Sequence, residues 1–198
     1  MDMVIDNLSK KYNDKVVLNN FSNTFKDNSI TFITGTSRMG KTTLIRILMY
    51  LGKADSGNIT GISHKKISTV FQDDNLCKNL SVLLNIKLVC EDLSDLEIEN
   101  ALELLDLKDC INKRVRELSG GMKRRIAILR TLLYDFYLLI MDEPFKGLDM
   151  ETKYKVKDFV ISKMKNKSAI IITHDIDDIR YFRSHKESII DFKMPLIY

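Results

Sequence analysis

The fold of this chain is decided by the stretch Ile30-Thr31-Phe32-Ile33-Thr34-Gly35-Thr36-Ser37-Arg38-Met39-Gly40-Lys41-Thr42. Its apolar start predicts a strand over Ile30 to Thr34. The two glycines, the lysine and the threonine that follow have the spacing of a phosphate-binding loop. Apolar residues then recur at helical spacing, at Leu44, Ile47, Leu48 and Leu51. Strand, loop and helix in this order predict a nucleoside triphosphate site, a property that kinases, GTPases, helicases and motors share.

The residues of the loop have separate expected parts in binding the nucleotide. Backbone N–H groups from Ser37 to Thr42 form a concave anion site, and Lys41 reaches the β- and γ-phosphates. The Thr42 hydroxyl binds Mg²⁺, and Thr43 supports the loop near the α-phosphate. The predicted nucleotide-binding residues of this region are Gly35, Thr36, Ser37, Arg38, Met39, Gly40, Lys41, Thr42 and Thr43.

Length and composition predict one ordinary globular domain. The chain has 198 residues, a formal net charge of +4 and three cysteines without Cys-x-x-Cys spacing. This cysteine pattern argues against both a disulfide framework and a zinc site. The apolar run Phe136 to Met141 is far shorter than the roughly 20 residues of a membrane span, and the start lacks the pattern of a signal peptide. We therefore expect a cytoplasmic protein with reduced thiols.

The small net charge gives little reason to expect a nucleic acid partner. The densest basic cluster is Lys123-Arg124-Arg125 with Arg130, and it falls on a predicted helix. A solvated helix face is the expectation for such a cluster.

Hydrophobic periodicity predicts alternating strands and helices. Further strands are expected at Val4 to Leu8, Val16 to Phe25, Ile67 to Phe71, Tyr137 to Met141, Ala169 to Thr173 and Glu187 to Phe192. A turn is expected at Asp55 to Asn58, and helical pattern at Asn79 to Leu107, after Ser119 and at Thr152 to Met164. The alternation implies a largely parallel sheet with right-handed crossovers and a helical insertion.

An apolar strand ends in two carboxylates at Leu138-Leu139-Ile140-Met141-Asp142-Glu143. At the carboxyl edge of a parallel sheet, these acids would lie beside the phosphates. Asp142 would then hold Mg²⁺ through its water shell, while Glu143 orients and deprotonates the attacking water. The alternative is two exposed acids that cap a turn before Pro144.

Leu118-Ser119-Gly120-Gly121-Met122, at the start of a predicted helix, resembles the signature sequence of the ATP-binding cassette (ABC) family. In that family the signature lies across ATP held by another copy of the domain. The resemblance therefore implies a homodimer or a pair of cassettes, in which Ser119, Gly120 and Gly121 of one copy close on the nucleotide of the other. It also implies that the nucleotide is ATP.

Isolated residues gain roles through the same resemblance. His174 would contact the γ-phosphate and the attacking water, and Gln72 would contact Mg²⁺ and water. Tyr12 resembles the aromatic residue that stacks on adenine, and Asp149, in Gly147-Leu148-Asp149, would help to couple the two sites. Taken alone, each of these residues is weak evidence for a role at the site. The alternatives are an ordinary polar histidine, a surface glutamine and a half-buried strand tyrosine.

The family resemblance covers nearly the whole chain and implies its architecture. We expect a P-loop (RecA-like) α/β core with a mainly parallel sheet, an N-terminal antiparallel β subdomain and an inserted helical subdomain. The single domain 1–198 would divide into a nucleotide-binding core, residues 1–75 and 126–198, and a helical signature subdomain, residues 76–125. Two departures from the family pattern are Arg38, where glycine is usual, and Met122, where glutamine is usual.

The leading functional hypothesis is an ATP-hydrolysing subunit of a membrane transporter, peripheral on the cytoplasmic face. Val70 to Asp73 and Pro144 to Asp149 resemble the branch that energises nitrate, sulfonate and taurine importers. The implied partners are an integral membrane permease, docked near Leu76 and Leu80, and an extracytoplasmic solute-binding protein. A soluble ABC ATPase acting in assembly or remodelling, and a module that binds ATP but barely hydrolyses it, are the alternatives.

Overall fold

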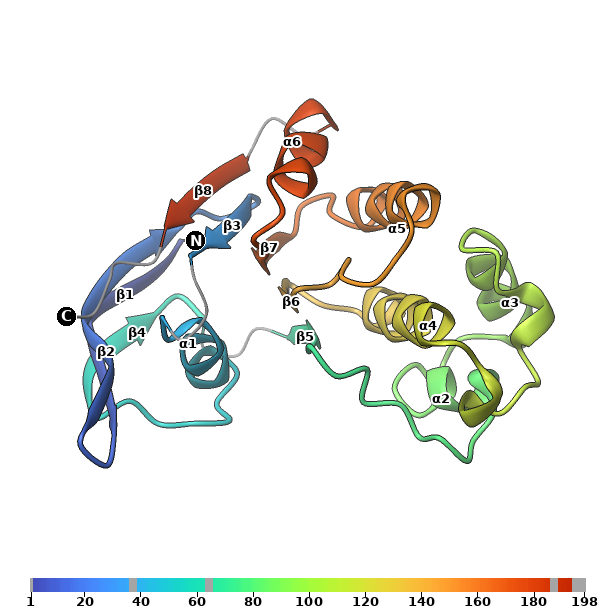
Figure 1. Cartoon of the computed structure of the whole chain (residues 1–198), viewed down its shortest axis with the longest axis horizontal. Helices are drawn as coiled ribbons and strands as arrows, with labels where there is room; N and C mark the ends of the chain where they lie inside the picture. The colour runs from blue at the N-terminus through green and yellow to red at the C-terminus, as the bar shows by residue number, and fades with distance from the viewer. Residues whose placement is uncertain (1, 36–38, 63–65, 186–188, 194–198) are drawn as a thin grey trace.

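The computed structural model describes residues 2–35, 39–62, 66–185 and 189–193, arranged as two sheets flanked by helices (Figure 1). A three-stranded antiparallel sheet has the order β2-β1-β4, formed by β1 (Met3–Tyr12), β2 (Lys15–Phe25) and β4 (Ser56–Thr60). A five-stranded parallel sheet has the order β5-β6-β7-β3-β8. Its strands are β3 (Ile30–Thr34), β5 (Ile67–Val70), β6 (Leu138–Asp142), β7 (Ser168–Ile172) and β8 (Ile189–Lys193).

Apart from the last one, which was not predicted, the helices follow the predicted order along the chain. They are α1 (Lys41–Leu48), α2 (Val82–Lys87), α3 (Asp95–Glu103), α4 (Gly120–Leu133), α5 (Met150–Ser162) and α6 (Ile176–His185), with 3-10 turns at Lys108–Cys110 and Val115–Glu117. Ser94 and Glu97 form a capping box at the start of α3, a pattern that the spacing Ser94-Asp95-Leu96-Glu97 indicates in the sequence as well. None of these helices, over the residues that the structure describes, is long and apolar enough to cross a lipid bilayer.

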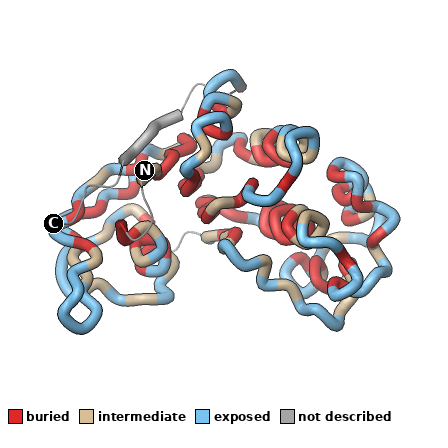
Figure 2. Tube along the Cα trace, in the orientation of Figure 1, coloured by how far each residue is buried: buried red, intermediate tan, exposed pale blue. Residues whose placement is uncertain are grey.

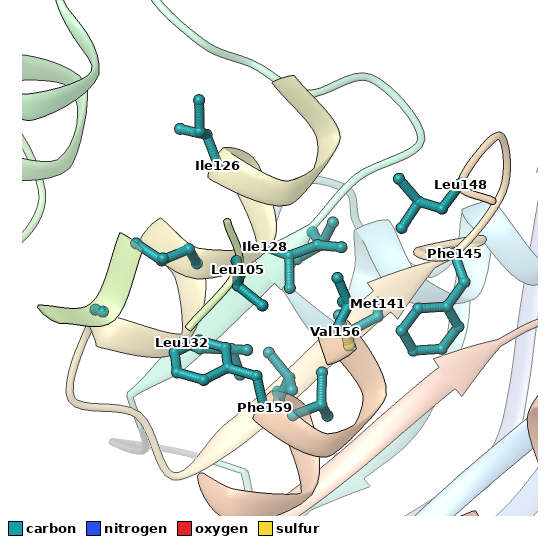
Figure 3. Close-up of a cluster of buried hydrophobic side chains, with 14 of the residues drawn as sticks. Leu105, Ile126, Ile128, Leu132, Met141, Phe145, Leu148, Val156 and Phe159 are labelled. Atoms are coloured by element: carbon teal, nitrogen blue, oxygen red, sulfur yellow. The ribbon is translucent and has the colours of Figure 1, made fainter. Parts of the chain in front are cut away.

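The parallel sheet separates two hydrophobic clusters, which explains why its strands read as continuous apolar runs. Along β6, Leu139 and Met141 belong to the cluster beneath α4 and α5, whereas Leu138 and Ile140 belong to the cluster beneath α1 and the antiparallel sheet. Figure 2 shows burial concentrated along β6, β7 and α4. Figure 3 shows part of the first cluster, in which side chains from α4, β6 and α5 meet.

The predicted turn at Asp55 to Asn58 is wrong, because Ser56–Thr60 forms strand β4 on the edge of β1. Gly57 lies in this strand with φ of 91°, and a Cβ atom there would come within 2.5 Å of the Asn7 carbonyl oxygen. The glycine therefore allows close backbone approach at a β-bulge, a use that sequence alone does not distinguish from a turn.

The remaining predicted elements are confirmed, with shifts of up to four residues at their ends. Glu187 and Ser188, at the start of the last predicted strand, lie outside the described residues. The helical insertion is divided into α2 and α3, and the apolar face of α4 is buried at Ile126 and Leu129. Cys90 and Cys110 are buried free thiols and Cys77 is an exposed one. The division into residues 1–75, 76–125 and 126–198 stays a prediction.

Candidate nucleotide-binding and catalytic site

The candidate site forms where four parallel strands end at one edge of the sheet. Strand β3 leads to Gly35, β5 to Gln72, β6 to Asp142 and Glu143, and β7 to His174. Because the strands are parallel, their carboxyl ends meet at the same edge, as Figure 1 shows for β5, β6, β7 and β3. Residues far apart in the sequence are thereby brought together.

Gly40 gives the loop its shape. It is the residue before α1, with φ of 83°, and a Cβ atom there would lie 2.4 Å from the Val17 carbonyl oxygen. Strand β2 therefore packs directly on the loop backbone, and only glycine fits. The Met39 side chain is buried in the core, so its expected contribution is confined to its backbone. Thr36, Ser37 and Arg38 lie outside the described residues.

Lys41 folds back over the loop, where its Nζ donates to the Gly35 carbonyl oxygen at 2.6 Å. Burial lowers the pKa of Lys41, while the nearby charges of Glu143 and Asp142 act in the opposite direction. The ammonium is thus held at the loop, close to two acids, where it can bind a phosphate.

Thr42 and Asp142 are the pair predicted to hold Mg²⁺, and the structure brings them together. The Thr42 hydroxyl and the Asp142 Oδ2 atom are 3.5 Å apart. Burial, followed by the charge of Glu143, raises the pKa of Asp142. A hydroxyl and a carboxylate form an oxygen donor pair that suits a hard cation such as Mg²⁺. Among the described residues, no group of three or more His, Cys, Asp or Glu side chains could hold a metal ion.

Glu143 and His174 form a direct pair. The Glu143 Oε1 atom lies 2.6 Å from His174 Nδ1, and the Glu143 N–H donates to the Ile172 carbonyl oxygen at 2.9 Å. Glu143 has a φ of 46°, an uncommon conformation for a non-glycine residue that is found preferentially at functional sites. The His174 ring remains largely exposed, so it is free to contact a bound phosphate as well.

One open cleft of about 500 Å³, here called the loop cleft, contains nine of the fifteen predicted site residues that the structure describes. It is lined by Tyr12, Lys15, Val17, Gly40, Lys41, Thr42, Thr43, Gln72, Asp142, Glu143, Lys146 and His174. Tyr12 stands half-exposed on its rim, with the Lys10 ammonium 5.3 Å from its ring centroid. An exposed ring beside a phosphate site is suited to stacking on a base.

A second cleft of about 370 Å³, the signature cleft, lies at the start of α4. It is lined by Gln72, Asp73, Asp74, Gly120, Gly121, Arg124, Glu143, Lys146 and Gly147. Ser119 caps α4 by accepting a bond from the Met122 N–H at 3.3 Å, and a Cβ atom at Gly120 would meet nothing within 4 Å. The signature residues therefore do not line the loop cleft of their own chain.

Comparison with known proteins identifies the family of the chain. The family model described as "ABC transporter" matches residues 18–146. The chain belongs to this family. The sulfate/thiosulfate import ATP-binding protein CysA of Mesostigma viride is 34% identical over 194 residues, which cover 88% of this chain and 55% of that protein. The chain thus spans about half the length of such curated relatives.

Solved ABC cassettes share the fold. The dimeric structure of the bacterial ABC transporter cassette MJ0796 has a TM-score of 0.81 and 27% identity, covering 96% of this chain and 94% of that one. A dimeric post-hydrolysis state of MJ0796, bound to ADP and Pi, has a TM-score of 0.82 and 25% identity, covering 98% of this chain and 97% of that one. The predicted α/β fold and the ABC resemblance are confirmed.

Asp149, predicted to couple the two sites of an ABC dimer, acts within the single chain as the N-cap of α5. Its carboxylate accepts from the Thr152 N–H at 3.0 Å, a bond that lowers the pKa of Asp149. Asp149 lines neither cleft. Its contribution to nucleotide binding stays a prediction.

Our interpretation of the sequence was wrong for Arg124 of this ABC cassette and did not identify Lys146 as a site residue. The expectation that Arg124 lies on a solvated face is wrong, because its side chain is buried at 6% exposure beneath the signature cleft. Its guanidinium donates to backbone carbonyl oxygens. Every residue type has such a carbonyl, so these partners cannot be predicted from the sequence. Lys146 lines both clefts. A lone lysine between Pro144 and Gly147 belongs to no binding pattern that would have identified it.

Proposed function

We propose that this chain is the ATP-binding and ATP-hydrolysing subunit of a membrane ABC transporter and that it works in a head-to-tail pair of cassettes. The observation that carries the proposal is the separation of the two clefts. The loop cleft has a phosphate-binding loop, an ammonium and two acids, whereas the signature cleft presents bare glycines without a phosphate loop. A second cassette would supply the nucleotide that the signature cleft lacks.

Within the loop cleft, each side chain has a distinct chemical part. Lys41 and the loop amides bind the β- and γ-phosphates, and Tyr12 stacks on adenine. Thr42 and Asp142, with Gln72 beside them, would hold Mg²⁺, which neutralises phosphate charge when bound.

Glu143 acts on the attacking water. Its carboxylate accepts a water proton while the water oxygen forms a bond to the γ-phosphorus and the bond to the β,γ-bridging oxygen breaks. The 2.6 Å contact from His174 Nδ1 fixes the orientation of that carboxylate and keeps the other ring nitrogen available to the γ-phosphate. Since phosphoryl transfer depends mostly on positioning and charge stabilisation, this arrangement can direct the water at the γ-phosphorus once a second cassette completes the site.

The partners follow from the transporter proposal. An integral membrane permease would anchor the subunit at the cytoplasmic face of the membrane, and an extracytoplasmic solute-binding protein is a further candidate. CysA of Mesostigma viride is named for sulfate/thiosulfate import, which supports an importer and is compatible with the nitrate, sulfonate and taurine branch. Of the two expected docking residues, Leu76 packs partly against the core and Leu80 is half-buried, so both contribute to packing as well.

Two measurements test the proposal. Phosphate release from ATP should require Mg²⁺ and should rise more steeply than linearly with protein concentration, because two chains form each site. Purification from membranes should also recover a permease with the chain. Linear, metal-independent phosphate release would contradict the paired mechanism. Active protein that never associates with a membrane chain would favour the soluble ABC ATPase.

A further inference from the structure

Arg124 is the most heavily bonded buried cation at the site. It lies on α4 with its guanidinium between two chain segments. Nη1 donates to one of these segments, and Nη2 and Nε donate to the other. Arginine presents its donors in a rigid planar fork, so a single side chain can bond two backbone segments at a fixed separation.

One arm of the fork holds the segment that carries Gln72. The Nη1 atom donates to the Phe71 carbonyl oxygen at 2.5 Å and to that of Gln72 at 3.4 Å. The same nitrogen is 3.3 Å from the Asp74 carboxylate. The segment after β5 is therefore tied to α4 by its backbone.

The rest of the fork holds the segment that carries Glu143. The Nη2 atom donates to the carbonyl oxygens of Asp142 at 3.0 Å and Glu143 at 2.9 Å, and Nε donates to that of Pro144 at 2.8 Å. These three carbonyls lie in the turn that gives Glu143 its unusual φ of 46°. The conformation of the catalytic carboxylate's own backbone thus depends on this side chain.

The helix that carries Arg124 also carries the signature. Ser119 caps it, and Gly120 and Gly121 form its open first turn. An α-helix moves as a rigid element, so displacement of its first turn displaces the guanidinium in the next. The contacts of the signature with a partner and the backbone positions of Gln72 and Glu143 are therefore connected through one buried group.

We propose that Arg124 is a positioning residue that couples the signature helix to the two loops carrying Gln72 and Glu143. Seating of the signature on a partner's ATP would then set the catalytic geometry in the chain's own loop cleft. This inference rests on the proposed function, because it assumes ATP hydrolysis by paired cassettes. The Arg124 hydrogen bonds go to the segments after β5 and β6 and not to the phosphate-binding loop, so we expect ATP binding by the single chain to change less than hydrolysis.

The test compares Arg124→Lys and Arg124→Met with the wild-type chain and with Lys123→Met. Lys123 is the neighbouring basic residue on α4, with no hydrogen bond or ion pair to either loop, and serves as the matched control. Arg124→Lys keeps the charge, but its point-like ammonium cannot span both sets of carbonyls. The measurements are kcat, KM, the ATP affinity of the monomer and hydrogen exchange by mass spectrometry.

We expect both Arg124 variants to lose at least about tenfold in kcat while KM and monomer affinity stay within about threefold. Amide exchange should accelerate in peptides covering 71–76 and 142–149 but not in those covering β3 and α1. Lys123→Met should match the wild type in each measurement. If Arg124→Met does not fold, the kcat and the hydrogen exchange of Arg124→Lys alone test the proposal.

Wild-type kcat in the Arg124 variants would overturn the proposal. So would a loss of kcat accompanied by faster exchange throughout the chain, since that pattern indicates a general role in stability. Absence of ATP hydrolysis by the wild-type chain would instead overturn the proposed function. In that case, exchange at the two loops would still decide whether Arg124 holds them together.

Discussion

The loop cleft and the signature cleft share Gln72, Glu143 and Lys146 but differ in what else surrounds them. The loop cleft adds Lys41, Thr42 and Asp142, so it has both the positive charge and the oxygen donors that a metal-bound triphosphate needs. The signature cleft adds three glycines, two aspartates and a buried arginine, which gives close access but no phosphate loop. The difference teaches that one cleft can bind ATP alone, whereas the other can only complete a site that is formed elsewhere.

The largest expected effect separates binding from chemistry within the loop cleft. Glu143→Gln should lower phosphate release by at least about a thousandfold, roughly 4 kcal/mol in barrier, because the amide cannot accept the water proton. ATP affinity should be preserved, since Lys41, Thr42 and the loop amides are unchanged. Size-exclusion chromatography with ATP should then show accumulated dimer. Hydrolysis near the wild-type rate in this variant would exclude Glu143 as the base.

The second effect separates the two clefts. Ser119→Arg should lower hydrolysis by about a hundredfold, because a long side chain at the open start of α4 obstructs a partner's ATP. Affinity of the monomer for ATP should change less than about threefold, since Ser119 does not line the loop cleft. Lys41→Ala is the control, which should lose monomer affinity outright. Equal loss of affinity in both variants would show that the signature acts on its own chain's nucleotide.

The third effect compares one glycine from each cleft. Gly40→Ala should destabilise the fold by about 1 to 3 kcal/mol, because it combines φ of 83° with a Cβ atom 2.4 Å from the Val17 carbonyl oxygen. Gly120→Ala meets no atom within 4 Å and should leave the melting temperature unchanged or higher, since alanine favours a helix. Thermal unfolding of the two variants without nucleotide measures this directly. A similar decrease in both would mean that the signature turn is as constrained as the loop.

The smallest expected effect concerns the ionisation of Asp142 in the loop cleft and its cost to thermal stability. Burial and Glu143 raise the pKa of Asp142, so the folded chain binds this proton more tightly than the unfolded chain, and ionisation of Asp142 costs stability as the pH rises. Asp142→Asn should therefore raise the melting temperature by a few degrees at neutral pH while lowering Mg²⁺-dependent hydrolysis. The stabilisation should disappear below the ordinary pKa of an aspartate. A lower melting temperature at neutral pH would show that the carboxylate stabilises the empty site.

The sequence by itself determined most of the strands and helices, though not β4 or α6, and most of the loop cleft. Phosphate binding requires glycines, a lysine and a threonine at fixed spacing, and parallel strands place any acid at their carboxyl ends on one edge. The glycine loop and Asp142-Glu143 were therefore readable from a linear pattern, whereas the roles of Gln72 and His174 came only from the family resemblance. Ser119 and Ser94 were readable as helix caps for the same reason, because capping acts within one turn.

Only the tertiary structure decided that Gly57 lies in a strand and that the Arg124 side chain is buried. Gly57 lies in a strand because the backbone of β1 approaches it closely, and that neighbour is distant in sequence. Arg124 is buried because its partners are carbonyl oxygens of five residues in two other segments, and every residue type carries a carbonyl. Interactions between a side chain and distant backbone leave no residue pattern, and so the group that joins the two clefts was visible only once the chain was folded.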